Sequence, residues 1–383
     1  MKIIADQNIP FVKECFSSIG DVTAVSGREI TAEILRDADI LLVRSITPVN
    51  EQLLSGSKVK FVATATIGFE HVDIDYLNAH NIGFTSAPGS NANSVAEYII
   101  AALLEIGKNH NIELAGKSIG IIGVGNVGSR VENKCKAIGM NVVLNDPPLR
   151  RQTNDDKYRP IEELYNCDFI TFHTPLTYEG QDKTHHLADE DFFSNLKNGV
   201  IFLNTSRGGV VDTGSLKNAL KTGKIKAAVL DVWEDEPAID TDLLEMVDIG
   251  TPHIAGYSYD GKVAGMIMIY NEACAYFNIE AKHRIGDFLP KPAVPEVKIQ
   301  IKGFSDQRIL RAAVNEIYKI KDDDRRMRGI LNLPLGKRCA AFDKLRKEYP
   351  VRREFQNTNI ILAAENTEKV MKKLNGIGFQ VNI

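Results

Sequence analysis

Three polar side chains that lie far apart in the chain each follow a predicted strand, and together they could oxidise an alcohol. Arg207 lies in "NTSRGGVVD", Glu236 in "LDVWEDEP" and His253 in "GTPHIAGYSYDG". A histidine beside a carboxylate can accept a proton as a general base, because the negative charge favours the protonated ring. An arginine can hold a substrate carboxylate through two parallel hydrogen bonds. Each residue alone is typical of an ordinary loop, so the chemistry depends on the elements that would position them.

A glycine-rich turn supplies the context that these three residues need. The segment "GIIGVGNVGSR" has Gly123, Gly125 and Gly128 in G-x-G-x-x-G spacing, between a predicted strand and a predicted helix. Such glycines permit a tight turn, a close approach of the backbone to a pyrophosphate and close packing of helix on strand. Asp146 ends the next predicted strand, where a carboxylate binds ribose hydroxyls and repels a 2′-phosphate. The sequence therefore predicts a dinucleotide site that prefers NAD to NADP.

The hydrophobic pattern predicts an α/β fold with two doubly wound parallel sheets, Rossmann-like or flavodoxin-like. Up to about residue 90, near-continuous apolar runs such as "ADILLVRS" and "KVKFVATAT" alternate with helical segments, which is typical of strands buried on both faces. From 117 to about 255 the alternation becomes regular. Between the two regions we expect a long buried helix that starts near Ser94, with Ser94 and Glu97 at capping-box spacing.

A proline-rich stretch, residues 286–298, reads as a linker to a small C-terminal α+β domain. Beyond it, the predicted strands "VKIQIKG", "TNIILAAE" and "QVNI" and the predicted helices "DQRILRAAVNEIYKI" and "TEKVMKKLNGIG" surround a charged stretch. The predicted organisation is a substrate-binding lid domain (1–93 with about 258–285), an NAD-binding domain (94–257) and a C-terminal domain (286–383). We expect the last domain to hold two copies of the chain together as a homodimer.

Composition narrows the classes of partner. With 46 Lys and Arg against 50 Asp and Glu, the formal net charge of -4 argues against a nucleic-acid or anionic-membrane partner. The longest apolar stretch is too short to span a bilayer, and the start has no signal-peptide pattern. Five scattered cysteines fit a reduced, cytoplasmic compartment. No metal site is expected, because metal-ligand spacing is missing among His110, His173, His185 and His186.

The order of the motifs resembles the D-isomer-specific 2-hydroxyacid dehydrogenase family. G-x-G-x-x-G, "TSRGG", an Asp-x-x-x-x-Glu-Pro segment and "PHIAG" follow one another, and the resemblance covers about residues 40–275. "APGSNANSVAEY" also resembles the segment that crosses between the two domains of that family. The resemblance implies NAD as cofactor and Arg207, Glu236 and His253 as the catalytic set, with His253 as the acid/base.

Narrower motifs point to one activity within the family. "VRSITPVN", "FVATATIGFEHVD", "TFHTPLTYEGQDKTHHL" and "FDKLRKEYPVRREF" resemble, over residues 1 to about 355, members that oxidise 4-phospho-D-erythronate at C2 to 2-oxo-3-hydroxy-4-phosphobutanoate in vitamin B6 biosynthesis. The same matching implies substrate binding by Ser45, Thr66 and Tyr257, and cofactor binding by Asp146, Thr174, Asp231 and Gly256.

A substrate with both a carboxylate and a phosphate needs two anion sites, and Arg207 can serve only one. Arg44 and Ser45, in "LLVRSIT", are predicted to bind the phosphate through charge-assisted hydrogen bonds; the basic run "KLRKEYPVRR" of a partner subunit is the alternative. Other readings stay open at this point. The enzyme could be phosphoglycerate dehydrogenase or another D-2-hydroxyacid dehydrogenase, and the non-enzyme alternative is a scaffold that senses NAD without turnover.

Overall fold

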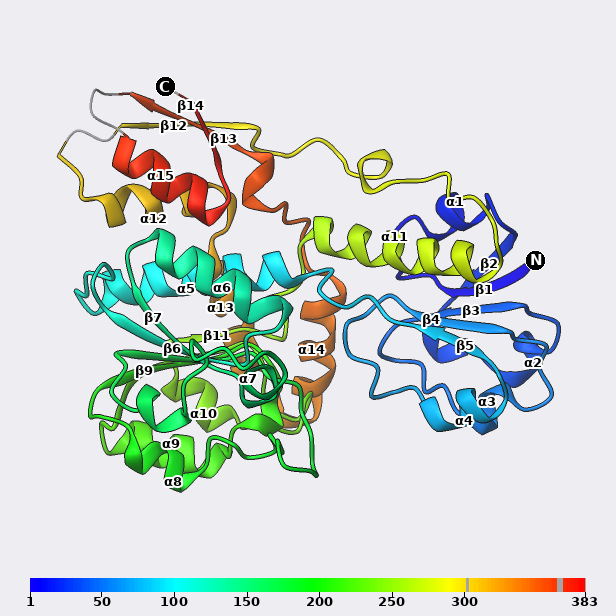
Figure 1. Cartoon of the computed structure of the whole chain (residues 1–383), viewed down its shortest axis with the longest axis horizontal. Helices are drawn as coiled ribbons and strands as arrows, with labels where there is room; N and C mark the ends of the chain where they lie inside the picture. Colours follow the sequence, from blue (N-terminus) through cyan, green and yellow to red (C-terminus); the bar gives the residue numbers. More distant parts are fainter. Residues whose placement is uncertain (301–302, 364–367, 383) are drawn as a thin grey trace. The chain divides into compact units, whose positions relative to one another are not determined.

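The computed structural model describes residues 1–300, 303–363 and 368–382, and the chain divides into two compact units (Figure 1). The first unit comprises Met1–Asn91 and Ser258–Lys291, and the second comprises Ala92–Tyr257 and Pro292–Ile383. Both are α/β units built on parallel strands, as the pattern predicts. A separate C-terminal domain at 286–383 remains a prediction.

The first unit is a five-stranded parallel sheet in the order β2-β1-β3-β4-β5. Its strands are β1 Lys2–Asp6, β2 Asp21–Val25, β3 Ile40–Val43, β4 Phe61–Thr64 and β5 Gly83–Thr85; its helices are α1 Val12–Phe16, α2 Ala32–Leu35, α3 Glu51–Leu54, α4 Ile74–Ala79 and α11 Tyr259–Tyr276. Alternate residues of β3 belong to different hydrophobic clusters: Ile40 and Leu42 to one, Leu41 and Val43 to the other. Both faces of the sheet are therefore covered, which explains the continuous apolar runs.

The second unit contains a six-stranded parallel sheet in the order β11-β10-β9-β8-β6-β7. Its strands are β6 Ser118–Ile122, β7 Asn141–Asn145, β8 Phe169–Phe172, β9 Val200–Asn204, β10 Ile225–Leu230 and β11 Ile249–Gly250; its helices up to Tyr257 are α5 Ala92–Asn109, α6 Asn126–Ala137, α7 Pro147–Thr153, α8 Glu190–Asn195, α9 Thr213–Lys221 and α10 Thr241–Met246. Strand β6 has β7 on one side and β8 on the other, so the direction of winding reverses there. In open α/β sheets, ligands bind outside the carboxyl ends of the strands at such a reversal.

The C-terminal part of the second unit adds a three-stranded parallel sheet in the order β12-β13-β14. Its elements are β12 Glu296–Gln300, α12 Asp306–Ile317, α13 Ile320–Arg328, α14 Leu335–Lys347, β13 Asn359–Ala363, α15 Glu368–Ile377 and β14 Gln380–Asn382. The three strands predicted here extend into residues 301–302, 364–367 and 383, which lie outside the described residues.

The charged stretch predicted between α12 and β13 folds into two helices, so that interpretation was incomplete. Acidic and basic residues of α13 pair along the helix, as in Arg325–Asp322 and Arg328–Asp324. Such pairs one turn apart stabilise a helix that has few apolar residues. Met327 and Phe342, the apolar side chains that anchor the two helices, are fully buried.

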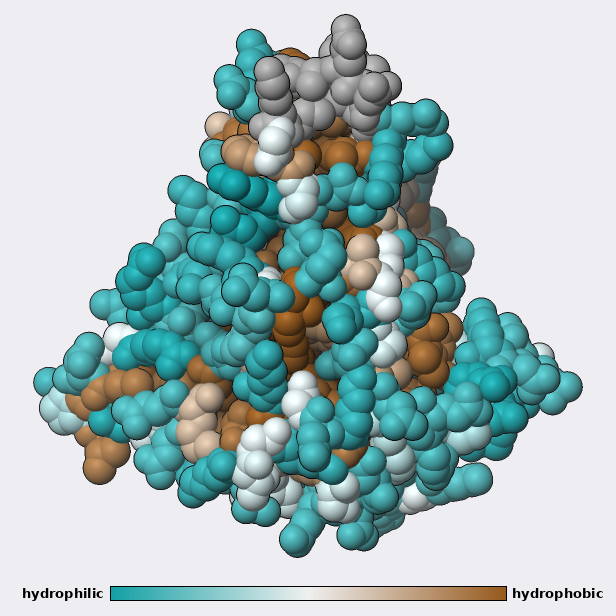
Figure 2. Space-filling model, turned by 90° about the vertical axis from the view of Figure 1, so that its left-hand side faces the viewer, coloured by the Kyte–Doolittle hydropathy of each residue, from teal (hydrophilic) through white to brown (hydrophobic). Residues whose placement is uncertain are grey.

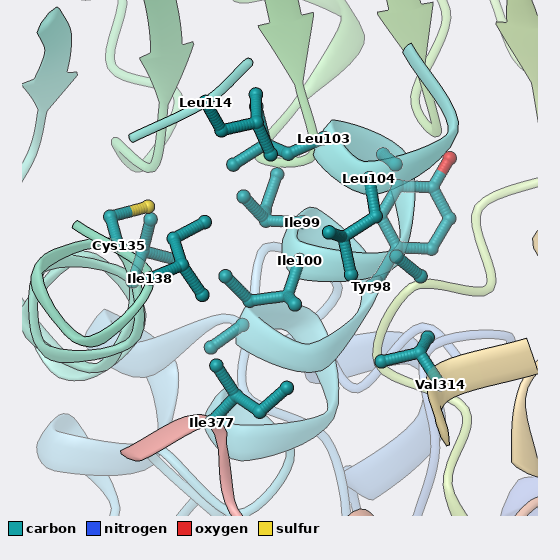
Figure 3. Close-up of a cluster of buried hydrophobic side chains, with 14 of the residues drawn as sticks. Tyr98, Ile99, Ile100, Leu103, Leu104, Leu114, Cys135, Ile138, Val314 and Ile377 are labelled. Carbon is teal, nitrogen blue, oxygen red and sulfur yellow. The ribbon is translucent and has the colours of Figure 1, made fainter. Parts of the chain in front are cut away.

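Helix α5 is hydrophobic on nearly all sides because other elements surround it. Figure 3 shows Ile100 and Leu104 of α5 between side chains of α6 and side chains from the C-terminal part of the chain, including Val314 and Ile377. All these residues belong to one hydrophobic cluster. The C-terminal segment therefore completes the core around α5, which also includes residues of the six-stranded sheet.

The capping box predicted at the start of α5 was wrong. The helix begins at Ala92, and both Ser94 and Glu97 are buried inside it. Ser94 Oγ donates to Glu354 Oε1 at 2.8 Å, and Glu97 Oε1 accepts from the backbone N of Phe355 at 3.0 Å. Burial, followed by the charge of Glu354, raises the pKa of Glu97 to about 8. The two polar side chains therefore tie α5 to residues 354–355 instead of capping the helix.

Among the described residues, no helix has both the length and the apolar character needed to cross a membrane. Figure 2 shows one face of the protein, on which hydrophilic side chains cover most of the surface and hydrophobic ones gather in small areas. All five cysteines carry free thiols, and four of them are buried.

We expect Glu97→Ala to lower the free energy of unfolding by about 1–3 kcal/mol, because a buried backbone donor loses its acceptor. The buried donor is the Phe355 amide, whereas the half-buried Asn93 Nδ2 also donates to Glu354 and so keeps an acceptor. Urea unfolding measures the change, and Glu113→Ala serves as the control because Glu113 is exposed. Equal stability of the two variants would contradict the structural role of Glu97.

Candidate active site

The turn between β6 and α6 leaves space for a ligand at only one of its three glycines. Gly123 has a φ of 87°, and a Cβ there would come within 2.7 Å of the His173 carbonyl oxygen. A Cβ on Gly128 would lie 2.0 Å from the Gly123 carbonyl oxygen. By contrast, a Cβ on Gly125, the residue before α6, would have no atom within 4 Å. The turn is therefore tight against the sheet but open at the helix N-terminus, where a pyrophosphate binds in such folds.

Asp146 connects the glycine turn to the end of the next strand. Its Oδ2 accepts from the backbone N of Val124 at 2.8 Å, and its Oδ1 accepts from the backbone N of Leu149 at 2.9 Å. Each oxygen keeps a further lone pair for a ribose hydroxyl. Thr174, two residues after β8, has a buried hydroxyl that lacks a hydrogen-bond partner within the described residues. An open helix N-terminus, a fixed carboxylate and an unpaired buried hydroxyl fit a dinucleotide.

Asp231 organises the loop that follows β11. The carboxylate is buried and accepts three hydrogen bonds: from Thr251 Oγ1 at 2.6 Å and from the backbone N of Ile254 and of Ala255 at 2.8 Å each. Burial raises the pKa of Asp231, and the three donors and the nearby His253 oppose that rise. The backbone N of His253 also donates to the Asp231 carbonyl oxygen at 2.7 Å. Asp231 thus fixes the backbone on both sides of the histidine.

His253 and Glu236 form a hydrogen-bonded pair, with 2.8 Å between His253 Nδ1 and Glu236 Oε2. The other carboxylate oxygen of Glu236 accepts from the backbone N of Trp233 at 2.8 Å. Burial alone would raise the pKa of Glu236, but the ring of His253 and this amide lower it overall. The carboxylate is therefore ionised and can orient the ring. His253 has a φ of 57°, a left-handed conformation that the Asp231 contacts hold in place.

Arg207 lies on the loop after β9, which touches the loop after β10. A Cβ on Gly208 would lie only 1.9 Å from the Trp233 carbonyl oxygen, so only glycine permits this approach. Asn204 Nδ2 donates to the Arg207 carbonyl oxygen at 2.9 Å and fixes the backbone there. The contact brings the loop of Arg207 next to the loop of Glu236. All three predicted catalytic residues therefore lie on loops that follow adjacent strands at one edge of the sheet.

Gly256 and Tyr257 continue the loop of His253. The backbone N of Tyr257 donates to the Ile254 carbonyl oxygen at 2.8 Å, which closes a turn that contains Gly256. The ring of Tyr257 packs edge-on against Tyr349, and the guanidinium carbon of Arg346 lies 5.9 Å from its centre. The basic run that was considered as a contribution of a partner subunit thus lies beside Tyr257 of its own chain.

The substrate residues predicted in the first unit follow neighbouring strands. Arg44 and Ser45 come directly after β3, and Thr66 comes two residues after β4. Arg44 is partly exposed and Ser45 is exposed. The hydroxyl of Thr66 donates to the Gly68 carbonyl oxygen at 2.8 Å. These residues lie at the carboxyl edge of their own sheet, and their contact with substrate remains a prediction.

Sequence reasoning missed a second layer of residues that hold the catalytic loops. Trp233 Nε1 donates to the Thr251 carbonyl oxygen at 2.9 Å, and the Tyr98 hydroxyl lies 2.7 Å from Thr251 Oγ1. The only tryptophan of the chain, two residues after Asp231, was a usable signal. Tyr98 carried none, because it lies in an apolar helix more than 150 positions from its partner.

His185, His186 and Glu234 come together although their spacing shows no metal motif. Their ligand atoms lie within 4.8 Å of one another. Glu234, however, already uses both oxygens: Oε1 pairs with His186 Nε2 at 2.6 Å, and Oε2 accepts from the backbone N of Thr213 at 3.2 Å. The hydrogen bond between His186 and Glu234 accounts for the contact of the two loops, and the expectation of no metal site stays a prediction.

Comparison with known proteins agrees with this geometry. A family model described as "D-isomer specific 2-hydroxyacid dehydrogenase, NAD binding domain" matches residues 103–255, and a model described as a domain of unknown function matches residues 288–378. Among solved structures, D-lactate dehydrogenase of Aquifex aeolicus, complexed with NAD and lactic acid, is 28% identical with a TM-score of 0.60; it covers 73% of this chain and 96% of its own. NAD-bound 3-phosphoglycerate dehydrogenase of Entamoeba histolytica is 25% identical with a TM-score of 0.62; it covers 76% of this chain and 99% of its own.

Two curated relatives match the whole chain. Erythronate-4-phosphate dehydrogenase of Hahella chejuensis is 40% identical over 382 residues, which are 100% of both chains. Erythronate-4-phosphate dehydrogenase of Proteus mirabilis is 41% identical over 99% of both chains. With the glycine turn and the histidine–carboxylate pair in place, this likeness shows that the chain belongs to the erythronate-4-phosphate dehydrogenases of the D-isomer-specific 2-hydroxyacid dehydrogenase family.

Proposed function

We propose that this chain oxidises 4-phospho-D-erythronate at its C2 hydroxyl to 2-oxo-3-hydroxy-4-phosphobutanoate, a step of vitamin B6 biosynthesis. The observation that carries the proposal is the 2.8 Å pair between His253 and Glu236, at the edge of a sheet whose glycine turn fits a dinucleotide. The relatives that match the full chain are named for this oxidation. NAD, when bound, accepts the hydride that leaves C2.

His253 acts as the general base. Its Nδ1 bonds to the ionised Glu236, so the ring proton lies on Nδ1 and Nε2 has a lone pair for the C2 hydroxyl proton. As the proton moves to Nε2, the ring becomes positive, and the Glu236 carboxylate stabilises that charge. Asp231 contributes by holding the backbone of His253 from both sides.

Arg207 binds the substrate carboxylate beside the reacting carbon. A guanidinium can hold both carboxylate oxygens and so fix the face of C2 that is presented to the cofactor. Arg44, Ser45 and Thr66 of the first unit are proposed as further substrate ligands, because they follow the ends of β3 and β4.

The open alternatives have less support. Phosphoglycerate dehydrogenase is represented by a structure at 25% identity, whereas relatives named for the erythronate reaction reach 40–41% over the full chain. A scaffold that senses NAD without turnover would have no need of a base paired with an ionised carboxylate, yet His253 and Glu236 form that pair.

A homodimer through the C-terminal part of the chain is also proposed. Leu335 is 76% exposed and Val351 is 68% exposed, both large apolar side chains at the two ends of the α14 region. The same part of the chain has a hollow lined by Ile330, Leu333, Ala341, Leu345 and Pro350 among others. A twofold copy that covers such a surface would remove it from water.

Replacing His253 tests the base. We expect His253→Asn to fold and bind NAD but to lose roughly 10²–10⁴ in kcat, the usual contribution of general-base catalysis. Stopped-flow and steady-state formation of reduced nicotinamide measure the change, and calorimetry with NAD checks that the site is intact. Wild-type turnover in this variant would rule out His253 as the base.

The pH profile gives a second readout for the same pair. Glu236→Gln removes the charge that favours the protonated ring, so the acidic limb of kcat/KM should move to lower pH. An unchanged acidic limb would show that the charge of Glu236 does not affect protonation of the base.

Asp146 should set cofactor choice. Asp146→Ser removes the carboxylate that faces the ribose and repels a 2′-phosphate, so we expect weaker NAD binding with a relative gain for NADP. The ratio of kcat/KM for the two cofactors measures this. Because Asp146 also holds two backbone amides, unfolding is monitored in parallel. Equal losses for both cofactors would assign Asp146 to the fold alone.

Substitutions on the surface test the dimer better than truncation does. Cutting the chain near Pro290 would uncover the core around α5, which the C-terminal segment completes. We expect Leu335→Glu combined with Val351→Glu to yield a folded monomer in sedimentation velocity. Tyr178→Glu is the matched control, because Tyr178 is 64% exposed and lies between β8 and α8, outside the C-terminal part. A monomeric wild type, or a double variant that remains dimeric, would contradict the proposal.

A further inference from the structure

Two arginines of the C-terminal segment reach the loop of His253: Arg352 donates to the Ala255 carbonyl oxygen at 2.7 Å, and Arg346 lies beside Tyr257. Arg346, near the end of α14, has its guanidinium carbon 5.9 Å from the ring centre of Tyr257, four residues after His253. Its Nε is buried and has no hydrogen-bond partner among the residues that the structure describes. A buried charged donor without an acceptor costs free energy unless a ligand supplies one.

The surroundings keep Arg346 positively charged. Burial alone would lower its pKa, but the Tyr257 hydroxyl and the Glu236 carboxylate raise it overall. Glu236 is already engaged, with one oxygen bonded to His253 and the other to the Trp233 amide. Both oxygens of the Glu236 carboxylate therefore have other hydrogen-bond partners than the Arg346 guanidinium.

The substrate of the proposed reaction has a second anionic group that fits this charge. Its carboxylate is bonded to the reacting C2 and is proposed to bind Arg207. Its phosphate is carried by C4, two carbons beyond C2. Tyr257, on the loop just after the base, is already predicted to contact substrate. A guanidinium beside it can give a phosphate two charge-assisted hydrogen bonds.

We infer that Arg346, together with Tyr257, binds the terminal phosphate of the substrate and so determines the preference for a phosphorylated acid. The inference rests on the proposed function. It assigns to the C-terminal segment of the same chain the role that the sequence assigned to Arg44 or to a partner subunit.

The test compares kcat/KM for 4-phospho-D-erythronate and for D-erythronate in wild type, Arg346→Met, Arg346→Lys and Arg44→Ala. In Arg346→Met, the loss on the phosphorylated acid should exceed the loss on the other acid by roughly 10- to 150-fold, the worth of a hydrogen bond to a charged group. Arg346→Lys keeps the charge without the planar fork, so it should keep part of the preference and provides a folded variant if the first is unstable. Lys347→Met is the control, because Lys347 is the exposed neighbour on the same helix.

The outcomes separate this inference from the function on which it rests. A wild type that oxidises neither acid contradicts the proposed function itself. If wild type prefers the phosphorylated acid and Arg346→Met keeps that preference, or loses activity equally on both acids, only the inference fails. A selective loss confined to Arg44→Ala would place the phosphate in the first unit and would also overturn it.

Discussion

The buried carboxylate of Asp231 is the contact on which the catalytic edge of the sheet depends. It accepts three hydrogen bonds from the loop that carries His253, two of them from backbone amides. A buried carboxylate is costly to desolvate, so it remains in a fold only where donors compensate it. Here the donors belong to the loop of His253 itself: the Thr251 hydroxyl and the amides of Ile254 and Ala255. The cost of burial is thereby coupled to the position of the histidine, and a displaced loop would leave an unsatisfied carboxylate.

Contacts around Asp231 extend this constraint into the core. Thr251, one of its donors, also lies within hydrogen-bonding distance of the hydroxyl of Tyr98, a fully buried residue of α5. The close approach of Gly208 to Trp233 then sets the spacing between the loops of Arg207 and Glu236. The catalytic set is thus built from short loops fixed by backbone contacts, and this rigidity is what proton transfer over hydrogen-bond distance requires.

The sequence was a good guide where local chemistry decides the structure. The spacing of Gly123, Gly125 and Gly128 predicted the turn, because tight packing permits no side chain at the first and last of them. Motif order led to the pairing of Glu236 with His253, 17 positions apart. The sequence failed where distant segments decide. Ser94 and Glu97 have capping-box spacing, yet their partners lie about 260 positions away at Glu354 and Phe355. Arg346 was visible as part of a basic run, but only the packing of α14 brings it to Tyr257.

The position of α5 has a consequence for how the chain is made. Its hydrophobic sides are covered partly by residues such as Val314, Leu374 and Ile377, which are synthesised long after the helix itself. Until then the helix has an apolar face without its native neighbours, and such faces are prone to aggregate during synthesis. The six-stranded sheet can form earlier, but its final packing must wait for these later residues. A chain terminated before Val314 would therefore have an open core and would not be a smaller working enzyme.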